Sequence, residues 1–259
     1  MDFTLFIYKS LLTTFQSAGY AFYTFEDYLK CDKPEEKFVI LRHDIDAKAG
    51  NALATAKVEA TLGIRASYYF RIVPQSNQPE IIKQIAAMGH EIGYHYEDLS
   101  LSHGDTQKGL QLFKQHLSYF QSFYPVKTVC MHGSPRSPHD SKDLWSVFDY
   151  KDLGIIGEPY FDIDFSRLFY LTDTGRRWDG YKVSVRDKIP QHQERWIEEG
   201  KVYHKTQDII KALNNQVFPS QLMLATHPQR WTNNKLQWGK ELLSQKAKNI
   251  IKRILIRKQ

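Results

Sequence analysis

Residues 38–45 read FVILRHDI and residues 48–62 read KAGNALATAKVEATL. The first stretch is an apolar run typical of a buried strand, and the second is rich in Ala with apolar residues at helical spacing. Gly63 stands where a left-handed residue commonly ends a helix. This succession of a strand and a helix recurs along the chain, with strands expected at 65–71, 91–96 and 127–132 and helices at 79–88, 106–122 and about 140–150. This alternation predicts a parallel sheet with helices outside it, either open or closed into a barrel.

The second half of the chain is less regular. Strands are expected at 154–158, 165–173 and 221–227, a helix at 206–215, and a polar, turn-rich stretch up to about residue 200. Residues 1–37 are predicted to form a helix and a connector, and residues 240–259 a basic helix. Because we find no internal repeat, low-complexity run or linker, we expect one domain over residues 1–259.

Composition narrows the class of protein. Of the 259 residues, 42% are hydrophobic and 25% charged, which supports a sizeable core and excludes wholesale disorder. No 18 consecutive residues are apolar, so we expect no transmembrane helix. The first residues, MDFTLFIYKSLLTTF, lack a basic start and a small-residue cleavage site, which favours a folded helix over a signal peptide. Cys31 and Cys130 form no disulfide framework and no CxxC pair, so the simplest compartment is the cytoplasm.

The net charge of +6 lies in the last twenty residues, KELLSQKAKNIIKRILIRKQ, which hold seven Lys or Arg and one Glu. The rest of the chain is neutral, so a nucleic-acid groove within the domain is not expected. In this basic helix the apolar residues form one broad stripe: Leu243, Ala247, Ile250, Ile251, Ile254 and Leu255. Such a helix can lie on an anionic membrane at the inner face, or it can pack its stripe on the domain and expose its lysines.

Metal-ligand residue types collect where the predicted strands end. Because function gathers at the carboxyl ends of parallel strands, this placement predicts a site there. The residues concerned are His43, Asp44 and Asp46, then His95, Glu97 and Asp98, then His132, Gly133 and Arg136, and finally Asp173 and His227.

The chemistry that fits these residues is metal-assisted hydrolysis. A divalent ion held by a carboxylate and imidazoles lowers the pKa of its water to about 7. Asp44 and Asp46, two apart in an extended segment, point the same way, so one can bind the ion and the other accept a proton. His227 is the candidate to protonate a leaving group. The alternatives are that Asp44 and Asp46 cap the next helix, that His95 is a core histidine and that His132 anchors a turn.

The segments RHDID, GHEIGYHYEDL, HGSPRSP and LATHP together resemble the polysaccharide deacetylase (NodB-like) superfamily, which includes carbohydrate esterase family 4, over about residues 38–230. The resemblance implies an α/β fold with a distorted (β/α)7-type barrel. It also implies removal of N-acetyl or related acyl groups from sugars, with a bound metal that is usually zinc, although nickel, cobalt or iron would serve. We expect a role in cell-surface polysaccharide biosynthesis, with a glycan that can be lipid-linked.

Carried across by position, the resemblance gives each residue a role. Asp44 matches the general base and Arg136 the arginine that orients it, while Asp46 and His95 match metal ligands. Asp173 and Trp178 match the motif that steers the acid and lines the groove, and His227 matches the acid. Further candidates for substrate contact are His43 and Tyr94.

One position departs from the family pattern. The second metal-binding histidine is expected four residues after His95, where this chain has Leu99. The best substitute is His132, ahead of Glu97, Asp98 and His103. Two alternatives therefore stay open: a C–N hydrolase that works without metal, and a carbohydrate-binding protein that has lost catalysis.

Overall fold

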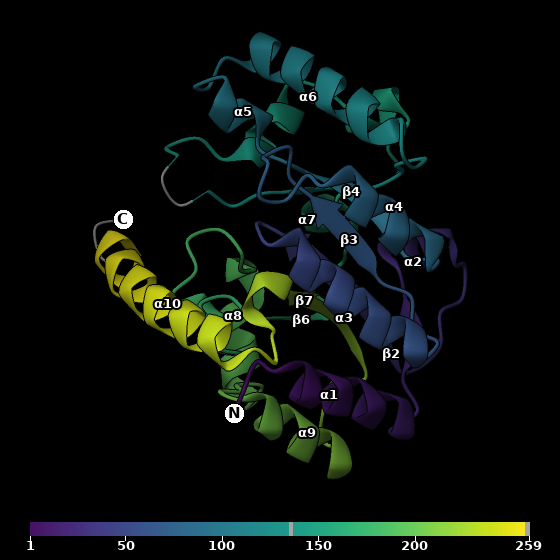
Figure 1. Cartoon of the computed structure of the whole chain (residues 1–259), viewed down its shortest axis with the longest axis vertical. Helices are drawn as coiled ribbons and strands as arrows, with labels where there is room; N and C mark the ends of the chain where they lie inside the picture. The colour runs from purple at the N-terminus through teal and green to yellow at the C-terminus, as the bar shows by residue number, and fades with distance from the viewer. Residues whose placement is uncertain (135–136, 257–259) are drawn as a thin grey trace.

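The computed structural model describes residues 1–134 and 137–256, with side chains up to residue 251. Its centre is a curled parallel sheet with helices around it (Figure 1). The order of the strands is β5 (Val129–Met131), β4 (Glu91–Tyr96), β3 (Ser67–Phe70), β2 (Phe38–Ile45), β7 (Gln221–Thr226) and β6 (Phe169–Thr172). β1 (Ala21–Tyr23) pairs with Phe38–Ile40, ahead of the part of β2 that pairs with β3.

The predicted α/β class and distorted barrel are confirmed. Within residues 1–134 and 137–256, no ladder closes the sheet between β5 and β6. A single parallel bridge, Thr128 to Gly157, is the only pairing on that side of β5 in those ranges. All eight residues of β2 are buried, because the strand lies at the centre of the sheet with helices outside it.

Helices connect and cover the strands. The longer ones are α1 (Leu5–Ser17), α3 (Ala49–Thr61), α4 (Pro79–Ala87), α6 (Thr106–Gln121), α8 (Pro190–Glu198), α9 (Thr206–Asn214) and α10 (Lys235–Ile256). Shorter ones are α2 (Phe25–Lys30), α5 (Asp98–Leu101), α7 (Pro159–Asp162) and the 3-10 turns η1 (Ser141–Ser146), η2 (Tyr150–Leu153), η3 (Gly180–Lys182) and η4 (Pro228–Arg230). α1 and α9 pack side by side, and α10 runs along the outside of the molecule (Figure 1). In the part of the chain that the structure describes, no helix is long and apolar enough to cross a membrane.

Most predicted elements are present with ends shifted by a few residues, and Gly63 has the positive φ expected of a helix end. Four expectations were wrong. Residues 154–158 contribute one bridge rather than a strand. The helix expected at 140–150 is two 3-10 turns. The connector within residues 1–37 contains β1 and α2, and the turn-rich stretch contains α8.

Candidate active site

β2 presents alternate residues to opposite faces of the sheet, as any strand does. On one face Arg42 donates two hydrogen bonds to Asp44, from Nε to Oδ1 at 2.9 Å and from Nη2 to Oδ2 at 2.7 Å. Both side chains are buried, and the guanidinium lies over the rings of Tyr160 and Tyr170. The Asp44 carboxylate is therefore fixed in orientation, with one lone pair on each oxygen left for other partners.

Asp46 follows β2 and points into the same cleft as Asp44. Its Oδ2 accepts a hydrogen bond from Gln229 at 3.0 Å, whereas its Oδ1 is buried and has no hydrogen-bond partner among the described residues. That oxygen lies 3.6 Å from Nε2 of His95 and 3.4 Å from Nε2 of His132. Burial by itself would raise the pKa of Asp46, but His95 and the neighbouring imidazoles lower it well below its usual value. An ionised carboxylate oxygen without a donor thus faces two imidazole nitrogens.

In both imidazoles Nδ1, the ring nitrogen away from Asp46, is hydrogen-bonded to another group. Nδ1 of His95 lies 2.8 Å from the carbonyl oxygen of Cys130, and Nδ1 of His132 lies 2.9 Å from Oε2 of Glu97. Burial opposes ionisation of Glu97, but His132 and Arg71 lower its pKa to about 2. Because a carbonyl and an ionised carboxylate can only accept, Nδ1 carries a proton in both rings. In the neutral imidazoles Nε2 is then left with a free lone pair directed at Asp46.

This arrangement fits a divalent metal. One carboxylate oxygen and two imidazole nitrogens, with hydrogen-bonded groups behind them, form a donor set that zinc and similar ions prefer. Burial tends to lower the pKa of His95, but Asp44 and Asp46 raise it, and the same negative charge favours a metal cation. His132, the predicted substitute for the missing histidine, lies beside Asp46, while Leu99 is buried in the core.

A second group of possible donors, Asp44, His95 and Cys130, is also buried and clustered. Both oxygens of Asp44 are held by Arg42, and burial raises the pKa of the Cys130 thiol well above its usual value. A thiol that keeps its proton is a poor ligand. The set made by Asp46, His95 and His132 therefore fits a cation better.

His227 stands on the opposite side of the cleft, just after β7. Its Nδ1 donates to Oδ1 of Asp173 at 2.7 Å, and Asp173 also accepts from Arg230 at 2.5 Å and from the Trp231 indole at 2.7 Å. Burial would raise the pKa of Asp173, but Arg230 and His227 lower it, so the carboxylate stays ionised. Nε2 of His227 consequently points into the cleft, 4.0 Å from Oδ2 of Asp46.

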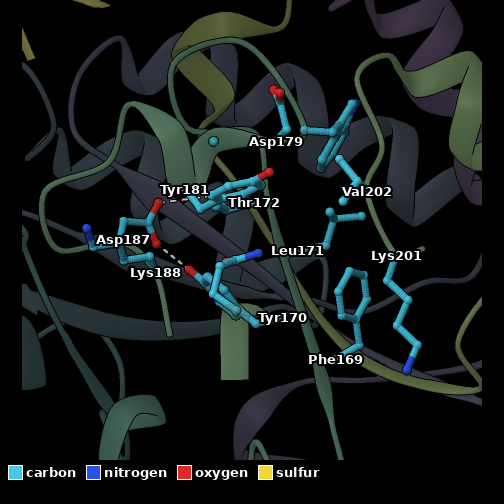
Figure 2. A pocket seen from close by; sticks show the side chains of 13 residues that line it. Phe169, Tyr170, Leu171, Thr172, Asp179, Tyr181, Asp187, Lys188, Lys201 and Val202 are labelled. Atoms are coloured by element: carbon cyan, nitrogen blue, oxygen red, sulfur yellow. Dashed lines mark hydrogen bonds between the residues drawn. The ribbon is translucent and has the colours of Figure 1, made fainter. Parts of the chain in front are cut away.

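Asp187 completes the cleft, and the sequence analysis missed it. Its Oδ1 accepts from Tyr170 and its Oδ2 accepts from Thr172 at 2.9 Å (Figure 2). Oδ1 also accepts from Tyr160 at 3.1 Å. Oδ2 also lies 4.0 Å from Nε2 of His227. Burial opposes ionisation, but His227 and Arg42 hold the pKa of Asp187 far below its usual value. The residue lies in the turn-rich stretch, where no periodic pattern marks a position as inward-facing.

Three residues predicted to contact substrate do not line this cleft. His43 is on the face of β2 opposite Asp44, fully buried, with Nδ1 2.6 Å from Oγ1 of Thr226 and Nε2 2.8 Å from Oε1 of Glu59. Tyr94 is buried beneath α6, and its hydroxyl donates to Asp98. Trp178 borders the small cavity of Figure 2, but it is 3% exposed and its indole donates to Thr206.

The remaining candidates of the sequence analysis are placed as follows. Arg136 lies outside the described residues. Arg42 donates two hydrogen bonds to Asp44, the contact that was expected of Arg136, and its position two residues before Asp44 is a signal that sequence alone offers. Asp98 accepts a hydrogen bond from His116 at 2.6 Å away from the cleft, and Glu97 lies behind His132. Asp44, Asp46, His95, His132 and His227 border one cleft, with Asp173 directly behind His227.

Comparison with known proteins adds structural similarity only. No family model matches the chain, and no curated protein matches it. A mutant of a CE4 family pseudoenzyme with restored enzymatic activity is 12% identical, with a TM-score of 0.43, over 83% of this chain and 64% of the other. PdaA of Bacillus subtilis, a family 4 carbohydrate esterase, is 12% identical with a TM-score of 0.42, over 92% and 83% of the two chains. IcaB from Ammonifex degensii is 16% identical with a TM-score of 0.37, over 54% and 70%.

The pseudoenzyme and PdaA carry the name of the family that the sequence resembles, carbohydrate esterase family 4. The chain spans 64% of the length of the first of these structures. At these identities and TM-scores the fold of this chain rests on its own structure, and the chemistry has to be inferred from the site itself. Fold and site define a parallel α/β protein with a carboxylate and imidazole cleft at the carboxyl ends of its strands.

Proposed function

We propose that this chain is a metal-dependent hydrolase that removes an N-acetyl or related acyl group from a sugar. The observation that carries the proposal is the buried Oδ1 of Asp46, which faces Nε2 of His95 and of His132 and has no hydrogen-bond partner in residues 1–134 and 137–251. Asp44 and His227 border the same cleft and supply groups able to accept and donate a proton.

Asp46, His95 and His132 would hold the ion, which we expect to be zinc, nickel, cobalt or iron. When bound there, such an ion supplies Lewis acidity, which lowers the pKa of a water and polarises an acyl carbonyl. Glu97 and the Cys130 carbonyl keep the two imidazoles in the protonation state and orientation that binding requires.

Asp44 takes a proton from the water while the oxygen of that water forms a bond to the acyl carbon. Arg42 holds the carboxylate in a fixed orientation, so that an accepting lone pair faces the cleft. His227, held by Asp173, gives a proton from Nε2 to the nitrogen as the C–N bond breaks. The products are a free amine on the sugar and a carboxylate, acetate in the simplest case.

The substrate we propose is an N-acylated sugar within a glycan, as in cell-surface polysaccharide biosynthesis. Beyond the reacting groups, the lining of the cleft is mainly polar and hydrogen-bonding, with Tyr160, Thr174, Ser184 and Arg186. Hydroxyls and a guanidinium suit a ligand that is covered in hydroxyl groups.

The test is the metal content of protein purified without chelator, measured by elemental mass spectrometry, followed by acetate release from N-acetylated glycans. We expect about one transition-metal ion per chain, lost in Asp46→Ala and retained in His204→Gln, a control at an exposed histidine away from the cleft. Acetate release that a chelator does not reduce would replace the proposal with metal-free hydrolysis. Protein that neither holds nor takes up metal and releases no acetate would point to carbohydrate binding without turnover.

A further inference from the structure

α10 packs its polar side against the protein. Glu241 on this side pairs with Lys48 at 2.6 Å, and Asn249 donates to the carbonyl of Gly175 at 2.8 Å. Trp238 lies against Arg176, with the guanidinium 4.4 Å from the centre of the ring. The attachments of α10 are therefore hydrogen bonds, an ion pair and one aromatic contact, rather than an apolar interface.

The apolar side of α10 faces away from the protein. Leu236 is 78% exposed, Leu243 69%, Ile250 61% and Ile251 59%. Leu236, Leu243 and Ile250 are seven residues apart, so they lie along one line of the helix. A surface helix of a globular protein normally places such a stripe on the core. Here the expectation that the stripe packs on the domain is wrong for the side chains that the structure describes, because they are exposed, whereas Ile254 and Leu255 lie outside the described side chains. α10 itself runs along the outside of the molecule (Figure 1).

The charges beside the stripe are of one sign. Lys235, Lys240, Lys246 and Lys248 are exposed, and the only acidic residue of α10, Glu241, is taken up by Lys48. The sequence continues with Lys252, Arg253, Arg257 and Lys258. Two copies of this helix placed stripe to stripe would bring lysine against lysine, with no glutamate to offset them. A second copy of the chain is thus a poor occupant, whereas an anionic surface is a complementary one.

We propose that α10 docks on a lipid membrane that carries anionic headgroups. Leu236, Leu243 and Ile250 enter the boundary between headgroups and acyl chains, and the flanking lysines meet the phosphates. α10 is fastened to Gly175 and Arg176, in the loop that begins with the site residue Asp173. Docking therefore holds the loop behind His227 close to the lipid surface. The inference does not depend on the proposed chemistry.

The experiment is sedimentation of the full chain with vesicles of phosphatidylcholine alone and of phosphatidylcholine mixed with phosphatidylglycerol. We expect binding to the mixed vesicles only, weakened by added salt because the attraction is screened. Replacing Lys246 and Lys248 with Gln should weaken binding about tenfold or more, since each basic residue near an anionic surface contributes about fivefold. Replacing Leu243 and Ile250 with Ser removes the inserted groups and should abolish sedimentation.

The matched control is Val217→Ser, which removes another exposed apolar side chain, 70% exposed, on the turn between α9 and β7. It should sediment like the unchanged protein. Thermal unfolding of each variant verifies the fold, which substitutions at exposed positions should leave intact. Equal binding by the Leu243 and Ile250 variant would overturn the proposal. The proposal would also be overturned if the unchanged protein sedimented with neither type of vesicle, or if it formed dimers through this stripe instead.

Discussion

Arg42 donates two parallel hydrogen bonds to Asp44, which lies two residues further along the same strand. An arginine and a carboxylate two residues apart on β2 share one face of the sheet, so the strand itself sets their geometry. The candidate base is thereby oriented by the centre of the fold rather than by a loop. Loop movements around the cleft should leave this pair undisturbed.

Arg42→Lys tests this pair. Lysine keeps a positive charge but cannot form the fork, so we expect acyl hydrolysis to fall by about tenfold to a hundredfold. Metal content should stay the same, because Asp44 is outside the proposed ligand set. Arg195→Lys, at an exposed arginine on α8, is the matched control. An unchanged rate would remove Arg42 from the mechanism.

Asp44→Asn tests the assignment of the base. An amide cannot take the proton of the attacking water, so the rate should fall on the order of 10²–10⁴-fold. Metal binding should persist, because Asp44 is outside the proposed ligand set. A variant that turns over at the normal rate would show that another group is the base, and Asp187 would be the first to examine.

Glu97→Gln tests the support behind His132. A neutral amide orients the imidazole less firmly and makes it a weaker donor to the metal, so metal affinity should fall about tenfold to a hundredfold. Titration of metal-free protein with zinc, followed by calorimetry, measures the change. Glu80→Gln, at an exposed glutamate, should bind like the unchanged protein. Equal affinity in the two variants would argue against His132 as a ligand.

Glu158 gives a prediction about stability rather than activity. Burial is the first cause of its raised pKa, about 7 against an ordinary 4.5. The folded chain therefore holds this proton more tightly than the unfolded chain. The associated stability is full below pH 4.5 and is lost as the pH rises through about 7, a difference on the order of 3 kcal/mol. Urea unfolding of Glu158→Gln should show a flatter dependence on pH over this range than the unchanged protein, and equal slopes would contradict the assignment.

The sequence predicts the parallel sheet well because its signals are local. The apolar runs at 38–45 and 221–227 and the Ala-rich stretch at 48–62 specify strands and a helix by periodicity alone. The convergence of Asp46, His95, His132, Asp173 and His227 follows, since the carboxyl ends of parallel strands meet at one edge. Their catalytic and metal-binding roles stay predictions.

The features that could not be predicted from the sequence are side-chain positions that depend on long-range packing. Asp187 comes from a stretch without periodicity, and its place beside His227 is set by hydrogen bonds with Tyr160 and Thr172. His43 was expected at the cleft because it directly precedes Asp44 in the sequence. Alternation along β2 instead turns its side chain to the opposite face of the sheet. The stripe of α10 is visible in the sequence, but only the structure shows which side faces the protein.

His43 has a further consequence through the 2.6 Å contact of its ring with Thr226. These two residues are register partners on β2 and β7, and each immediately precedes a reactive group, Asp44 on one strand and His227 after the other. A slip of one residue between the strands would break this contact and turn the reactive groups to the wrong side. His43 therefore helps to fix the spacing between Asp44 and His227, the proposed proton acceptor and donor, through the alignment of two central strands rather than through the surrounding loops.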